Sequence, residues 1–67
     1  MLSARNQFKG VVKSVKLGGV MAEVVVSVGD LEFVSAITRS SAEALGLKAG
    51  DEVKAVIKST EVLIDKP

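Results

Sequence analysis

Apolar and polar residues alternate along most of this chain, and glycine or aspartate interrupts the alternation at short intervals. Alternation with a period of two predicts β-strands that turn one face toward a core. Strands are therefore expected at 8–16, 20–28 and 31–37. Gly18-Gly19 and Gly29-Asp30 separate these stretches. Both pairs are typical of tight hairpin turns, in which glycine tolerates a positive φ.

The pattern changes after residue 37. Ser40 precedes Glu43 by three residues, which is a capping-box spacing, and good helix formers continue to Leu45. Gly46 stands where a helix can end in the left-handed conformation. A short helix is expected here, with Leu45 and Leu47 turned inward. Two further strands are expected after it, at 52–58 and 62–64.

Five strands with one short helix between the third and the fourth are the element order of an OB-like Greek-key barrel. The sequence thus predicts an all-β fold, with residues 1–67 as a single domain. Phe8 and Phe33 are expected in its core.

Apolar residues also stand on the outer faces of the expected strands, namely Met21, Val25 and Val56. A barrel in water should be polar there, although single exposed apolar residues are common. The chain has 67 residues and no cysteine or histidine, so disulfides and the usual zinc sites cannot stabilise it. Self-association is the remaining means of stabilisation, and it is expected here.

The composition also narrows the function. The eight acidic residues mostly lie at turns and strand edges among lysines, and no histidine is present, so the chain is not expected to be an enzyme. A net charge of +1 and two aromatic residues weaken the case for nucleic-acid binding. No apolar run reaches the roughly 18 residues of a membrane helix, and no signal-peptide pattern is present. A cytoplasmic protein without a membrane or nucleic-acid partner is expected.

Three polar clusters combine isolated cations with hydroxyl or amide donors, and they lie at 3–7, 38–41 and 58–60. None contains a carboxylate. Arginine, lysine, hydroxyl and backbone N–H groups suit a fully deprotonated oxyanion, which can only accept hydrogen bonds. Phosphate carries a proton near neutral pH and would need an acceptor. Each cluster alone is also ordinary for a cap or turn.

The Ser-Ala-Arg-Asn-Gln opening at 3–7 and the Lys-Ser-Thr-Glu-Val close at 58–62 resemble the molbindin family of small molybdenum-pterin-binding-like (Mop) domains. The Ala-Ile-Thr segment at 36–38, which leads to Leu-Gly-Leu at 45–47, belongs to the same resemblance. The likeness extends from residue 2 to residue 64. It implies an OB-like barrel that exchanges a strand with its dimer partner. In free-standing members it implies a homohexamer, built as a trimer of dimers, with oxyanions at subunit interfaces.

The resemblance also implies ligand-binding residues for molybdate or tungstate, with no organic cofactor and no directly coordinated metal. Transferred position by position, they are Ser3, Arg5, Thr38, Ser41, Lys58 and Ser59. Hexameric members have a second kind of site near a symmetry axis. The Gly18-Gly19 turn, with the amides that follow it, is the candidate for that site.

The function implied is intracellular storage, buffering or homeostasis of molybdenum. Two alternatives stay open: a small OB-like nucleic-acid-binding or regulatory domain, and an assembly domain without a ligand. The order of preference among molybdate, tungstate and sulfate also stays open.

Overall fold

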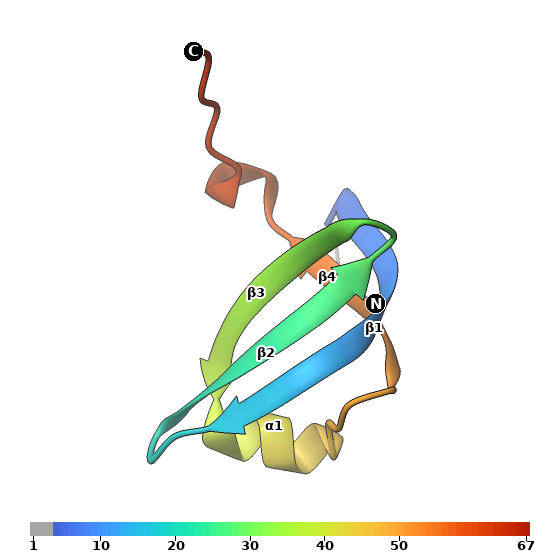
Figure 1. Ribbon diagram of the computed structural model, residues 1–67. Helices are drawn as coiled ribbons and strands as arrows, with labels where there is room; N and C mark the ends of the chain where they lie inside the picture. Colours follow the sequence, from blue (N-terminus) through green and yellow to red (C-terminus); the bar gives the residue numbers. More distant parts are fainter. Residues whose placement is uncertain (1–3) are drawn as a thin grey trace.

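In the computed structural model, residues 4–67 are described, and within them four antiparallel strands form one curved sheet in the order β3-β2-β1-β4. The helix α1 lies beneath one end of the sheet, and the C-terminal segment leads away from the opposite end (Figure 1). The elements are β1 (Asn6–Leu17), β2 (Met21–Val28), β3 (Leu31–Thr38), α1 (Arg39–Leu45), β4 (Glu52–Ile57) and the 3₁₀ turn η1 (Ser59–Glu61).

The four strands expected between residues 8 and 58 are confirmed, with ends that differ by one or two residues. The fifth strand, expected at 62–64, is wrong for the single chain. Val62 has extended backbone angles (φ −91°, ψ 112°), but residues 62–67 pair with no strand among residues 4–67. An extended segment becomes a strand only when a neighbour satisfies its N–H and C=O groups. The described residues therefore form a four-stranded sheet with one helix, and not a closed five-stranded barrel.

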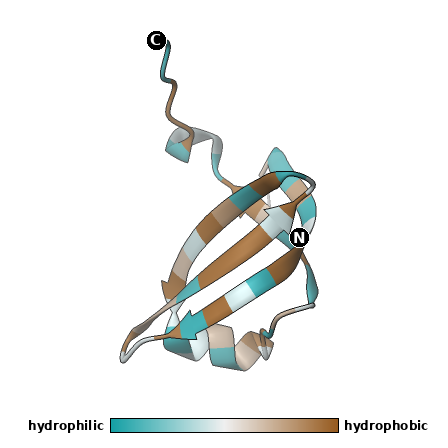
Figure 2. Cartoon of the chain, viewed as in Figure 1, coloured by the Kyte–Doolittle hydropathy of each residue, from teal (hydrophilic) through white to brown (hydrophobic). Residues whose placement is uncertain are grey.

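The core is a small cluster of valines on the inner face of the sheet. Val12, Val24 and Val26 are buried there, and half-buried apolar residues surround them, among them Leu47. β2 is hydrophobic along most of its length (Figure 2). The inward position expected for Leu47 is confirmed, whereas that of Leu45 is wrong, since Leu45 is 69% exposed.

The helix packs through a small side chain instead. Ala42 is buried, and the helix ends three residues later. Gly46 ends it in the left-handed conformation expected (φ 61°), so the chain turns inward only at Leu47.

β1 is shared between two neighbours. Its first half, from Asn6 to Val11, pairs with β4, and its second half pairs with β2, with a register shift between Val12 and Ser14. Gly10 stands where β1 passes from one partner to the other. A Cβ at Gly10 would lie 2.4 Å from the carbonyl oxygen of Ser27, so only glycine fits this approach.

The turns differ from expectation in one case. Gly29 has a positive φ (58°), as expected, but Gly18 and Gly19 do not. Glycine is needed at position 18 for steric reasons, because a Cβ there would lie 2.8 Å from the carbonyl oxygen of Met21.

In the loop before β4, Asp51 accepts hydrogen bonds from the ammonium and the backbone N–H of Lys48. These bonds lower the pKa of the Asp51 carboxyl below its usual value.

Phe8 and Phe33 pack against each other and not within the valine cluster. Their ring centroids are 5.2 Å apart at an interplanar angle of 89°, and Phe8 is 38% exposed. The core position expected for Phe8 and Phe33 is therefore wrong, since Phe8 is exposed and Phe33 is only half-buried outside the valine cluster. Of the three outward apolar residues, Met21 and Val56 are exposed, as expected, whereas Val25 is half-buried. No helix within residues 4–67 is both long enough and apolar enough to span a bilayer.

Candidate functional site

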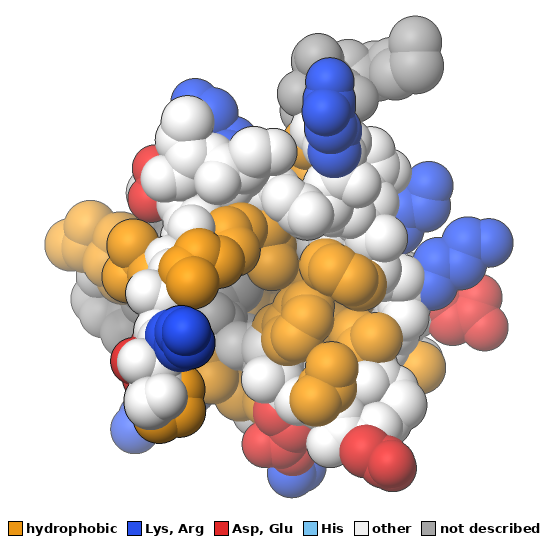
Figure 3. Space-filling view, turned by 90° about the horizontal axis from the view of Figure 1, so that it is seen from above, with side chains coloured by type: hydrophobic (Ala, Val, Ile, Leu, Met, Phe, Trp, Pro, Cys, Tyr) orange, Lys and Arg blue, Asp and Glu red, His pale blue; other side chains and the backbone are white. Residues whose placement is uncertain are grey.

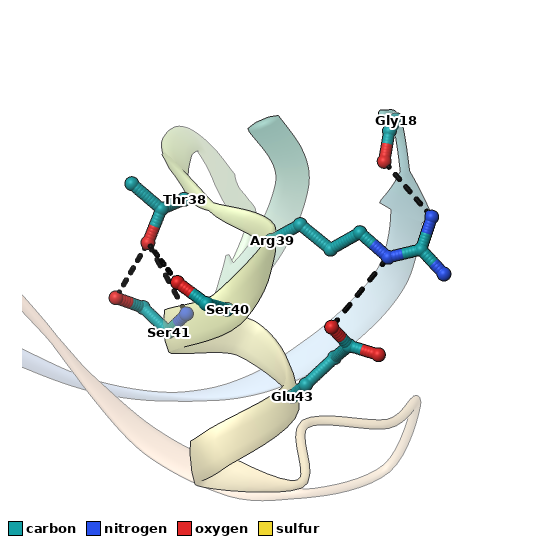
Figure 4. Close-up of polar contacts among 6 residues, drawn as sticks. All are labelled: Gly18, Thr38, Arg39, Ser40, Ser41 and Glu43. Atoms are coloured by element: carbon teal, nitrogen blue, oxygen red, sulfur yellow. Dashed lines mark hydrogen bonds and ion pairs between the residues drawn. The ribbon is translucent and has the colours of Figure 1, made fainter. Parts of the chain in front are cut away.

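The hydroxyl groups at the end of β3 gather around Thr38. The Thr38 Oγ1 accepts a hydrogen bond from the backbone N–H of Ser41 at 3.1 Å and donates to Ser41 Oγ at 2.7 Å (Figure 4). Ser40 Oγ lies 3.4 Å from Thr38 Oγ1. The expected capping box that starts at Ser40 is wrong, because the extended residue before the helix is Thr38 (φ −69°, ψ 148°). Two of the predicted site residues, Thr38 and Ser41, are thus brought together.

The turn between β1 and β2 lies beside these hydroxyls. Met21 pairs with Thr38 across the β2–β3 ladder, and the backbone N–H of Arg39 donates to the Val20 carbonyl at 2.8 Å. The guanidinium of Arg39 donates to the Gly18 carbonyl at 3.1 Å and lies 3.5 Å from a carboxylate oxygen of Glu43. The candidate second site at Gly18-Gly19 is therefore adjacent to Thr38 in one chain.

The two predicted cations lie together at another place. Asn6 pairs with Ile57 at the end of the β1–β4 ladder. Arg5 precedes that pair and Lys58 follows it, so both stand at the same sheet end, next to Ser59 in η1. Among residues 4–67, neither Arg5 nor Lys58 forms an ion pair with a carboxylate. Ser3 lies outside the described residues.

Within one chain, the hydroxyls of Thr38 and Ser41 lie far from the cations of Arg5 and Lys58. Thr38 faces the start of β2, next to the end of β1 at Leu17, whereas Arg5 and Lys58 stand at the Asn6 end of β1. The 12 residues of β1 lie between the two groups. At a rise of about 3.3 Å per residue, this strand is far longer than the reach of any side chain. One chain alone does not combine all the predicted site residues.

Sequence reasoning missed the role of Arg39. The residue was visible within the 38–41 cluster, but no local signal indicates that its guanidinium reaches Gly18, 21 positions away. Within residues 4–67, no group of three or more His, Cys, Asp or Glu side chains could hold a metal ion. The available polar chemistry at both groups is donation of hydrogen bonds by hydroxyls, cations and amides.

The aromatic pair offers little for nucleic-acid stacking. In the T-shaped pair of Phe8 and Phe33, the edge of one ring meets the face of the other. Proteins that bind single strands stack bases on free aromatic faces.

The TOBE domain family matches residues 2–64. Molybdenum-pterin-binding protein 3 of Clostridium pasteurianum is 53% identical over 64 residues, which are 94% of this chain and 94% of that protein.

Two solved structures share the fold. A molybdate-binding protein from Sporomusa ovata has a TM-score of 0.93 at 39% identity, with 98% of each chain covered. The cytoplasmic molybdate-binding protein ModG, solved with molybdate bound, has a TM-score of 0.83 at 46% identity over 87% of this chain and 42% of ModG. These relatives are named for binding and not for a reaction. The chain belongs to the TOBE domain family and, within it, to the molybdenum-pterin-binding (Mop, or molbindin) proteins.

Proposed function

We propose that this chain, acting as a single domain over residues 1–67, binds molybdate or tungstate at interfaces between its copies. Its role would be to store or buffer molybdenum in the cytoplasm. One observation carries the proposal: two groups of hydrogen-bond donors, Thr38 with Ser41 and Arg5 with Lys58 and Ser59, lie at opposite ends of β1. The solved structure of ModG with molybdate bound supports the choice of ligand.

The chemistry of the two groups is complementary. Arg5 and Lys58 supply positive charge, and Thr38, Ser41 and Ser59 supply hydroxyls. A charge contact of about 4 Å contributes roughly 1 kcal/mol in water and roughly 4 kcal/mol near a protein surface. A site enclosed between copies therefore holds a dianion better than either exposed group alone. Ser3, at the same chain end as Arg5, is included in this proposed set.

The hydrogen bonds around Ser41 leave its hydroxyl able to donate to an anion. Because Thr38 donates its proton to Ser41 Oγ, the proton of Ser41 is free to point outward. Donation from Thr38 also polarises the Ser41 hydroxyl and strengthens its own donation. The Gly18-Gly19 turn beside Thr38 would add backbone amides to a second site near a symmetry axis.

Assembly would complete the fold. β3 and β4 are the two edges of the described sheet, and the apolar side chains of Leu63 and Ile64 are 91% and 88% exposed. Hydrophobic side chains also gather on the face seen from above (Figure 3). Exchange of the 62–64 segment with a second copy would pair this segment and supply the fifth strand. Three such dimers would form the homohexamer.

Titration calorimetry with sodium molybdate and with sodium tungstate, together with the native mass of the assembly, tests the proposal. Saturable heat and a mass of six chains are expected. A protein that stays monomeric and takes up neither ion would refute it. Electrophoretic retention of single-stranded or duplex DNA at low salt, lost at high salt, would instead favour the nucleic-acid alternative.

A further inference from the structure

The turn between β1 and β2 has little to hold it in place. One hydrogen bond, from Gly18 N–H to the Met21 carbonyl at 2.7 Å, closes the turn. No atom lies within 4 Å of the place where Gly19 would carry a Cβ, and Val20 is 76% exposed. Consecutive glycines have wide conformational freedom. Something outside the turn must therefore fix its position.

Arg39 makes that connection through both its backbone and its side chain. Its N–H bonds to the Val20 carbonyl at 2.8 Å, and its guanidinium bonds to the Gly18 carbonyl at 3.1 Å. Glu43, one helical turn later, holds the guanidinium from the other side at 3.5 Å. The turn and the first turn of α1 are joined by one residue (Figure 4).

We propose that Arg39 is a positioning residue: by joining the Gly18 carbonyl to Glu43, it holds the β1–β2 turn against α1 and fixes the hydroxyls of Thr38 and Ser41 for the oxyanion. The inference rests on the proposed function for the role of those hydroxyls. The contacts of the Arg39 side chain with Gly18 and Glu43 are present in the ligand-free protein.

The geometry separates this role from direct binding. The side chain of Arg39 extends away from the Thr38 hydroxyl, toward Gly18 (Figure 4). Its planar guanidinium donates to the Gly18 carbonyl and faces the Glu43 carboxylate, so both contacts direct it away from the Thr38 and Ser41 hydroxyls. The positive charge that an oxyanion needs is thus left to Arg5 and Lys58.

Amide hydrogen exchange of the ligand-free protein tests whether Arg39 holds the β1–β2 turn against α1. Arg39→Met keeps the apolar stem and removes the guanidinium. We expect exchange to become about fivefold faster at the amides of Gly18, residue 39 and Ser41, since local opening of these bonds becomes easier. The amide of Leu47, bonded to the Ala42 carbonyl at the other end of the helix, should not change. Unchanged exchange at the first three amides would overturn the proposal.

Calorimetry with sodium molybdate, in a double-mutant cycle, tests the effect on binding. Arg39→Met should weaken binding about fivefold in the parent and by a smaller factor in the Ser41→Ala background, where one of the two positioned hydroxyls is gone. Arg39→Lys should restore part of the affinity, because one ammonium can reach only one of the two partners. An equal fivefold weakening of binding by Arg39→Met in the Ser41→Ala background would overturn the positioning role.

The two proposals fail in different ways. If the parent binds no molybdate, the proposed function fails, while the exchange measurement still decides whether Arg39 holds the turn.

Discussion

At the scale of single residues, Arg5 and Lys58 are the most direct test of the site. Arg5→Ala and Lys58→Ala should each weaken molybdate binding at least about tenfold, because each removes a charge-assisted contact. Neither side chain has a carboxylate partner among residues 4–67, so the melting temperature of the ligand-free protein should change little. Calorimetry and thermal unfolding measure the two effects.

Lys54→Ala is the matched control for these variants. Lys54 lies within β4, four positions before Lys58, where it pairs with Lys9, and it is also exposed. It should leave the dissociation constant unchanged. Equal binding by all three variants would refute the assignment of Arg5 and Lys58.

Gly10 carries a second prediction at this scale. Gly10→Ala places a Cβ 2.4 Å from a backbone oxygen that cannot move without the strand. Overpacking of this kind lowers the free energy of unfolding by about 1–3 kcal/mol, which urea denaturation would detect. Gly19→Ala is the control, because its Cβ would meet nothing within 4 Å and its φ is not positive. Similar losses in both variants would contradict the close approach at Gly10.

At the scale of elements, the start of α1 depends on the hydrogen bond between the Thr38 hydroxyl and the Ser41 N–H. Thr38→Ala removes the oxygen that accepts the Ser41 N–H and should lower the free energy of unfolding by about 1 kcal/mol. Thr38→Ser keeps the oxygen and should recover most of that loss. Ser40→Ala should have little effect, since Ser40 accepts no backbone N–H at this cap. Urea denaturation of the three variants checks this order.

The C-terminal segment carries the prediction for strand exchange. Leu63→Asp combined with Ile64→Asp should reduce the native mass of the assembly, because charged side chains oppose burial at an interface. The far-ultraviolet circular dichroism of the four-stranded sheet should persist, since neither side chain packs in the core. Lys66→Ala is the control and should assemble as the parent does. An unchanged mass in the double variant would exclude this segment from the interface.

At the scale of the whole molecule, stability should depend on assembly and ligand together. The core is small, with only five residues buried among those described. Ligand at 100 times its dissociation constant adds about 2.7 kcal/mol, so the melting temperature should rise with the logarithm of molybdate concentration. It should also rise with protein concentration. Sodium phosphate is the control and should have no such effect, and an equal rise with phosphate would contradict the acceptor-only ligand.

The strands, the left-handed Gly46 and the inward Leu47 were predictable, because each follows from local pattern. The cap was not. Both Thr38 and Ser40 suit a cap, and the choice depends on where the chain leaves β3. The segment at 62–64 has the composition of a strand but no partner in the chain, and no local pattern reveals a missing partner.

The sequence by itself determined which stretches extend, where one helix begins and ends within a turn, and which donors are offered without a competing carboxylate. These properties depend on side-chain type and on neighbours a few residues away. Tertiary structure alone decided which donors stand together. The β1–β4 register brings Lys58 beside Arg5, and the β1–β2–β3 ladder carries Thr38 to the opposite end. Arg39 meets Gly18 for the same reason, because strand pairing sets contacts between residues that are distant in the chain.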